Sequence, residues 1–153
     1  MRILFSILAF LCLFLAIPIM VVMLIVGLPV LIRSKRAYKN YVLVCTANSF
    51  YMVLAPLGYI YAFIKMSKPG FEKYNLRIAV SIDQNGNVCM QELLNDILIK
   101  NKAKEFGDED ETISSCIGRN KLATNLTILG RIIDYGLGRL DNNHSINSIE
   151  KTK

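Results

Sequence analysis

The sequence predicts a membrane-anchored protein in which a two-helix transmembrane hairpin is followed by a small, mainly helical α+β domain. Two long runs near the N-terminus carry no charge, and 53% of the 153 residues are hydrophobic. All 12 acidic residues lie at or after Glu72, whereas residues 1–64 contain basic charges alone. The two halves of the chain therefore suit different solvents. This asymmetry excludes a uniform globular enzyme, a large solute transporter and a disulfide-rich secreted toxin.

The first predicted span is residues 3–32, a run of 30 residues without a charge. About 20 apolar residues cross a bilayer, so the run is long enough for one tilted span. Pro18 lies near its middle and is expected to kink the helix, because proline removes a backbone hydrogen bond. A cleaved signal peptide is the alternative. The run is longer than the apolar part of a signal peptide, and no small-x-small cleavage site follows it, so we expect an uncleaved anchor.

The second predicted span is residues 41–64, with 24 uncharged residues. Tyrosines lie at both ends, as in the aromatic belts at membrane interfaces. Gly58 and Ala62 form a small-xxx-small pair that would let another helix approach closely, although lipid-facing small residues are the preferred interpretation. The link of residues 33–40 carries four basic residues and completes a hairpin with both ends on one side. The link carries four basic residues near the span ends, and the opposite side of the two spans carries five. The positive-inside rule therefore leaves the orientation open.

The remaining sequence predicts a small domain outside the membrane. The predicted boundaries place the first span and basic link in residues 1–40, the second span in 41–66, a linker in 67–75, the domain in 76–140 and a polar tail in 141–153. Of the 18 basic residues 13 lie from Lys65 onward, together with all 12 acidic residues, so this half is nearly neutral. Without a basic stripe, nucleic acid is not an expected partner.

Period-two alternation in residues 76–82 predicts a short strand, and Asn85-Gly86 predicts a tight turn after it. Residues 88–90 are either a return strand or the start of a helix. Apolar residues at helical spacing then predict an amphipathic helix over residues 89–102. A short helix is expected to begin at an Asp110 N-cap and to end at Gly118.

The last predicted helix covers residues 125–140, where leucines and isoleucines form one stripe. Its glycines weaken it by roughly 1 kcal/mol each relative to alanine. Close packing against the domain or the membrane surface would compensate.

The sequence contains no convincing catalytic or metal-binding constellation. Cys89 and Cys116 lie in no zinc-binding spacing, and we favour two separate buried thiols over a disulfide. Residues 83–94 begin like a calcium loop but lack its glycine and final glutamate. The acidic residues 108–111 are more typical of a solvated turn than of a cation site, and no nucleophile elbow surrounds Ser114 or Ser115. We therefore predict no enzyme activity, no cofactor and no metal site.

Two segments and a late histidine resemble a group of small uncharacterised proteins of tailed bacteriophages and prophages. The segments are Ser81-Ile-Asp-Gln-x-Gly-Asn87 and Asp110-Glu-Thr-Ile-Ser-Ser115, followed by His144. The resemblance covers about residues 78–148. The chain departs from the group's pattern at three places. Cys116 stands where the group has an arginine, and Ser145 stands where it has a cysteine. Residues 107–109 replace a Trp-Pro-like segment that leads into the second motif.

The resemblance implies a phage or prophage origin and no particular activity. The positions that it singles out, with the nearby Arg119, are the candidate binding residues: Asp83, Gln84, Asn87, Asp110, Glu111, Thr112, Ser114, Ser115, Arg119 and His144.

The leading functional hypothesis is a non-enzymatic, multi-pass protein of the bacterial inner membrane. Its small domain, expected in the cytoplasm, would bind a host or phage protein in envelope modulation or superinfection exclusion. The other expected contacts are the lipid bilayer and further copies of the chain through the spans. One alternative is a holin-like, pore-forming lysis protein. A second is a metal-dependent enzyme that uses the acidic cluster.

Overall fold

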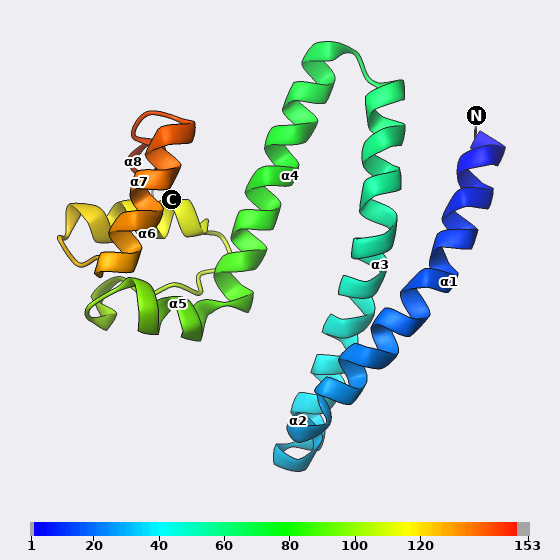
Figure 1. Ribbon diagram of the computed structural model, residues 1–153, viewed down its shortest axis with the longest axis horizontal. Coiled ribbons are helices and arrows are strands. Elements are labelled where there is room, and N and C mark those ends of the chain that lie inside the picture. Colours follow the sequence, from blue (N-terminus) through cyan, green and yellow to red (C-terminus); the bar gives the residue numbers. More distant parts are fainter. Residues whose placement is uncertain (1, 150–153) are drawn as a thin grey trace. The chain divides into compact units, whose positions relative to one another are not determined.

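The computed structural model describes residues 2–149, and within that range the chain is helical with no β-strand (Figure 1). The chain divides after Phe71 into two compact units. The helices of the first unit are α1 (Arg2–Val26), α2 (Leu28–Arg33) and α3 (Lys35–Lys65), and α4 (Lys68–Cys89) crosses the division. The second unit continues with α5 (Gln91–Leu98), the 3-10 turn η1 (Lys102–Lys104), α6 (Ile113–Leu122), α7 (Ile128–Leu140) and α8 (His144–Asn147).

The first unit is a hairpin in which α1 and α3 run in opposite directions (Figure 1). Both helices are long and apolar enough to cross a membrane: the segment Ile3–Val26 has 24 residues and Lys35–Lys65 has 31. The predicted link of residues 33–40 is mostly part of α3. Only Ser34 interrupts the helices there, and its hydroxyl accepts a hydrogen bond from the Ala37 amide at 3.3 Å. Serine at an N-cap satisfies an amide that the helix itself leaves unpaired.

Small side chains let α1 and α3 approach closely. Ala16 on α1 and Cys45 and Ser49 on α3 are all buried. The Ser49 hydroxyl donates to the Cys45 carbonyl oxygen at 2.8 Å, so the buried hydroxyl is satisfied within its own helix. At the closed end of the hairpin, the Tyr41 hydroxyl donates to the Met23 carbonyl oxygen at 2.8 Å. Gly58, a candidate for close helix packing, has nothing within 4 Å of where a Cβ would lie.

The predicted strand, and with it the α+β class of the second unit, is wrong. Residues 68–89 form the single helix α4, which includes residues 68–75 of the predicted linker, the predicted strand and the Asn85-Gly86 turn. The alternation of apolar residues is a local pattern, and the contacts of α4 override it. Asp83 and Asn87 are four residues apart, so a helix places them on one face, and both side chains bond to the segment 107–114.

The second unit has a small apolar core. Its buried members are Leu94, Leu98, Ile99, Phe106, Cys116, Ile117 and Leu126, with Ile113 and Leu137 packed against them. An isolated antiparallel bridge joins Ile99 to Leu126 and ties the end of α5 to the start of α7. The predicted helix 89–102 is therefore shorter, because Ile99 leaves the helix in an extended conformation to make this bridge.

Four other predicted features also differ from the structure. The N-cap of α6 is Thr112 rather than Asp110, and Gly118 lies inside α6 rather than past its end. A Cβ at Gly118 would overlap the Ser145 carbonyl oxygen, so glycine permits the packing of α8 on α6. The predicted polar tail thus contains a packed helix, while residues 150–153 lie outside the described range. The last helix begins at Ile128, because Thr127 caps it by accepting a hydrogen bond from the Gly130 amide at 3.1 Å.

The hairpin generates a prediction at Gly27, where an added Cβ would overlap the Tyr41 ring. We expect Gly27→Val to displace that ring and to destabilise the packing of α1 on α3 by roughly 1–3 kcal/mol, as is usual for overpacking. The measurement is the alkylation rate of the buried Cys45 thiol in detergent, resolved by peptide mass spectrometry, which should rise several-fold. Gly58→Val adds the same side chain in open space and is the matched control. Equal rates in the two variants would contradict the packing at Gly27.

Candidate functional site

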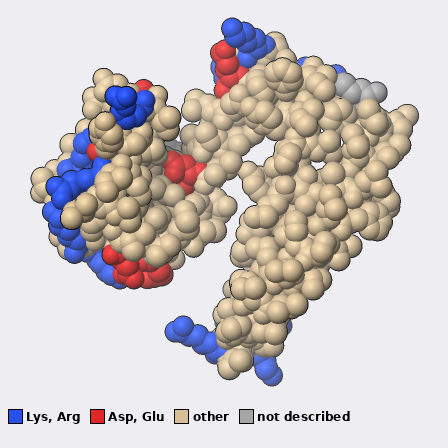
Figure 2. Space-filling model, in the orientation of Figure 1, with Lys and Arg blue, Asp and Glu red and all other residues tan. Residues whose placement is uncertain are grey.

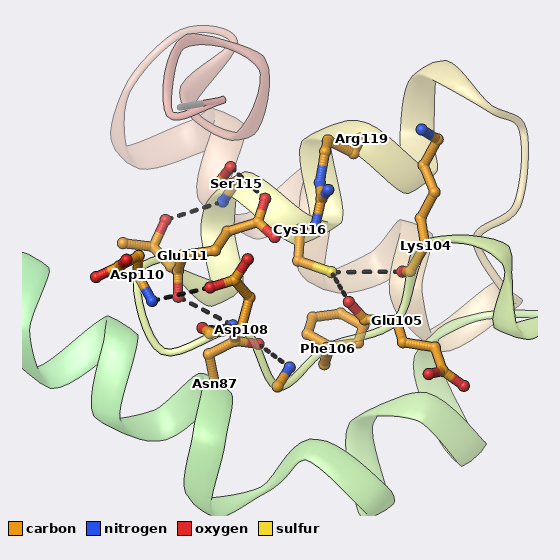
Figure 3. Close-up of polar contacts among 12 residues, drawn as sticks. Asn87, Lys104, Glu105, Phe106, Asp108, Asp110, Glu111, Ser115, Cys116 and Arg119 are labelled. Atoms are coloured by element: carbon orange, nitrogen blue, oxygen red, sulfur yellow. Dashed lines mark hydrogen bonds and ion pairs between the residues drawn. The ribbon is translucent and has the colours of Figure 1, made fainter. Parts of the chain in front are cut away.

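The side-chain amide of Asn87 is the centre of the predicted site. The residue is fully buried, and its nitrogen donates to the carbonyl oxygens of Asp108 at 2.8 Å and Glu111 at 2.9 Å (Figure 3). Its oxygen accepts from the Gly107 amide at 3.2 Å. One side chain of α4 therefore satisfies three backbone groups of the loop 107–111. Leaving such groups unpaired in a buried place costs free energy, so Asn87 fixes the path of this loop.

Two further residues of α4 hold the segment that follows. One carboxylate oxygen of Asp83 accepts from the Ser114 hydroxyl at 2.7 Å and from the Ser114 amide at 3.4 Å. This negative charge lies at the N-terminal end of α6, where the helix dipole favours it. The Gln84 amide donates to the Asp110 carbonyl oxygen at 3.0 Å.

An ion pair joins the residue before the N-cap of α6, Glu111, to Arg119 farther along the helix. Glu111 is only 7% exposed, and its two carboxylate oxygens have different partners. One accepts from the Ser115 hydroxyl at 2.7 Å, and the other pairs with the Arg119 guanidinium. The Thr112 hydroxyl oxygen accepts from the Ser115 amide at 3.1 Å and caps the helix. A buried carboxylate is tolerable when it is both paired and hydrogen-bonded, as Glu111 is.

The other end of the loop is held by Asn95 of α5. Its amide oxygen accepts from the Phe106 amide at 2.7 Å, and its nitrogen donates to the Phe106 carbonyl oxygen at 3.2 Å. Gly107 follows with φ +122°, a conformation in which glycine avoids strain, and a Cβ there would overlap the Gln91 side chain. The acidic loop, which we define as residues 106–111, is thus held at both ends.

Nine of the ten candidate residues are joined to this network, and His144 is the exception. The His144 ring lies 3.3 Å from the Asp141 carboxylate instead. The network is largely internal, because Asn87, Glu111, Thr112, Ser114 and Ser115 are all buried. The exposed part of the acidic loop is formed by Asp108, Glu109 and Asp110. Most of the candidate residues therefore support the exposed surface of the acidic loop from inside the domain and are not themselves part of that surface.

Sequence reasoning missed a second set of buried polar residues. The Asn120 amide donates to the carbonyl oxygens of Lys104 at 2.7 Å and Cys116 at 2.9 Å. Its oxygen accepts from the Asn125 amide at 2.7 Å. Asp134 of α7 accepts from the Ser145 hydroxyl at 2.5 Å and pairs with Lys121 at 2.9 Å. One pattern in the sequence could have indicated such residues, namely an asparagine among the apolar residues of a predicted helix. Asn95, which follows Leu94 and precedes Leu98, is an example.

The cysteines are separate free thiols rather than a disulfide. Cys116 is fully buried, as predicted, and donates to the Glu105 carbonyl oxygen at 3.4 Å. The predicted burial of Cys89 is wrong, because this residue is exposed. Burial, and secondarily the negative charge of Glu111, raise the pKa of the Cys116 thiol from 9.0 to about 11. Within residues 2–149 no group of three histidine, cysteine or acidic side chains is arranged to hold a metal ion.

No protein-family model, curated protein or solved structure matches the chain. The resemblance to phage and prophage proteins therefore remains a prediction from the quoted segments.

The network predicts that Asn87→Ala destabilises the second unit by roughly 2–4 kcal/mol, because the loop's backbone groups lose their partner in a buried place. Asn85→Ala is the matched control, since it makes the same change two residues away at an exposed position of α4. The measurement is the thermal unfolding midpoint of the full chain in detergent, followed by circular dichroism. If both variants unfold at the wild-type temperature, Asn87 does not hold the loop.

The burial of Cys116 predicts a pH dependence. Because the folded pKa of this thiol is raised to about 11, the thiol stabilises the fold below about pH 9, and this contribution is lost as the pH rises toward 11. At pH 8 we expect iodoacetamide to alkylate Cys89 at least about 100-fold faster than Cys116, because the reactive thiolate is rarer at Cys116. Peptide-resolved mass spectrometry gives both rates in one sample, and the unfolded chain, where the rates should converge, is the control. Equal rates in the folded protein would contradict the burial of Cys116.

Proposed function

We propose that this chain is a phage- or prophage-encoded integral membrane protein whose helical domain binds a host or phage protein. The observation that carries the proposal is that the polar residues of the candidate site bond to one another and to the loop backbone inside the domain. Their bonds leave the carboxylates of the acidic loop exposed on a fixed backbone. Such an arrangement suits recognition of a partner and offers no reacting group. Envelope modulation or superinfection exclusion is the role that we propose for this binding.

The network argues against hydrolysis by Ser114 or Ser115. Both serines are buried, and their hydroxyls donate to the carboxylates of Asp83 and Glu111. A nucleophilic serine needs a base that accepts its proton and access to a substrate carbonyl. His144, the one histidine of the chain, pairs with Asp141 instead. The acidic cluster likewise offers no assembled metal site among the described residues, so the metal-enzyme alternative has no geometric support.

The order of the acidic loop supports a binding role. The Asp108 carboxylate accepts from the Asp110 amide at 3.0 Å, and the Glu111 amide donates to the Asp108 carbonyl oxygen at 3.2 Å. The turn is therefore arranged before any partner arrives, which lowers the entropic cost of binding. Its negative charge complements a lysine- or arginine-rich segment of the partner, and such complementarity favours specificity and fast association.

The proposed location is the bacterial inner membrane, with α1 and α3 as the two spans and the domain in the cytoplasm. The apolar side chains of these helices are mostly exposed in the single chain, as a bilayer or further copies of the chain would require. A holin-like pore is the competing function. It uses the same two helices, but it gives no role to a folded domain with an ordered acidic loop.

The proposal predicts that a photoreactive amino acid at Glu109 forms a discrete protein adduct in a bacterial host. The matched control places the same residue at the exposed Lys102 of η1, where no adduct is expected. Adding Asp110→Lys to the Glu109 probe should reduce the adduct at least about tenfold, because reversed charge repels a basic partner. Membrane fractionation and the unfolding midpoint must stay unchanged. Absence of an adduct from the folded, membrane-bound protein contradicts the binding role, and loss of membrane potential on expression supports the holin instead.

A further inference from the structure

Helix α7 presents an apolar face that none of the described residues of its unit covers. Ile128, Ile132 and Tyr135 are 71%, 61% and 69% exposed, and their spacing places them on one side of the helix. Leu129 and Leu140 are also exposed and widen this surface toward the packed side of the helix, and we define these five residues as the α7 face. The opposite side holds the buried Gly130 and the partly buried Leu137, so α7 already has its packed side. A contiguous exposed apolar surface of this kind marks an interaction site.

Two arginines lie on the α7 helix itself, and Asp141, which pairs with His144, follows at its end. The arginines are Arg131 and Arg139, and neither forms an ion pair within the described part of the chain. Arg131 also lines a hollow of about 380 Å³ with Lys100, Lys121, Thr124, Leu126 and Asp134. Asp134, the single acidic residue of this lining, already has Lys121 and Ser145 as partners. Figure 2 shows lysine and arginine side chains gathered along one side of the second unit.

We propose that the α7 face lies on the surface of a bilayer that contains anionic lipids. Isoleucines, leucines and a tyrosine would enter the boundary between headgroups and acyl chains, while Arg131 and Arg139 would meet lipid phosphates. Arg131 lies beside the apolar residues, and Arg139 lies at the C-terminal end of their side of the helix. An apolar face accompanied by basic residues is the signature of a helix that lies in the membrane interface. Tyrosine is enriched at that depth.

Two further observations favour lipid as the occupant. The proposal rests on the membrane anchoring proposed above, and two spans in the same chain keep the domain at a high effective concentration near lipid. In addition, Gly136 and Gly138 face open space and weaken α7 by roughly 1 kcal/mol each relative to alanine. Contact with a membrane surface stabilises a helix that is otherwise weak.

The chain has no tryptophan, so one introduced tryptophan reports on its own surroundings. The reporter is Ile132→Trp in the full chain, with Tyr135→Trp as a second reporter that preserves an aromatic side chain. Leu93→Trp is the matched control, because Leu93 is a 57% exposed leucine on α5. Each protein is reconstituted into vesicles of equal parts phosphatidylcholine and phosphatidylglycerol, with or without brominated acyl chains. We expect blue-shifted emission and strong bromine quenching for the α7 reporters, and neither for the control.

The charge requirement is tested in the same samples. Replacing phosphatidylglycerol by phosphatidylcholine, or introducing Arg131→Glu with Arg139→Glu, should remove most of the quenching. Quenching that is unchanged by both would overturn the anionic-lipid assignment. Emission that is blue-shifted without bromine quenching would mean that a second copy covers the face, and this also overturns the proposal.

Flotation of the vesicles separates this proposal from the anchoring on which it rests. A chain that floats with the vesicles while its α7 reporters remain as exposed to acrylamide as Leu93→Trp refutes the lipid contact and leaves the anchoring intact. A chain that does not float refutes both.

Discussion

The second unit depends on one constraint: the fully buried amide of Asn87 needs hydrogen-bond partners, and so do the backbone groups that it contacts. The apolar core of this unit is small, so hydrophobic burial alone specifies its loops weakly. The bonds from Asn87 to Gly107, Asp108 and Glu111 bring a segment about twenty residues away in sequence onto α4. The fixed loop in turn positions the start of α6, the Glu111–Arg119 pair and the exposed carboxylates.

A buried polar network can specify one path for a loop, because any member that is left without a hydrogen-bond partner costs free energy. Asn95 and Asn120 repeat the arrangement at the other end of the loop and at the end of α6, each pairing with backbone groups that a loop cannot satisfy alone. The unit thereby buries much of its asparagine and serine network and exposes two different surfaces. One is the acidic loop, for which we propose a basic protein segment as partner, and the other is the α7 face with its arginines, for which we propose lipid.

The sequence allowed the prediction of some features and not others for physical reasons. The two candidate spans were readable because length and apolar composition are local properties of residues 3–32 and 41–64. The strand at residues 76–82 was wrong because its alternation is local, whereas the partners of Asp83 and Asn87 lie beyond residue 106. Nine of the ten candidate residues do meet in space, but the burial of Asn87, Glu111 and the serines could not be read from the sequence, since it depends on how α4, α5 and α6 pack. His144 gave no signal that its partner is Asp141.

The most direct test of this constraint is amide hydrogen exchange of the full chain in a bilayer, resolved to single residues by mass spectrometry. A loop held by Asn87 predicts slow exchange at the amides of Gly107 and Ser115 and through residues 78–89. These segments should open together, as one cooperative unit. Fast exchange at Gly107, with α4 and α6 still protected, would show that the loop is free of α4 and would contradict the central role of Asn87.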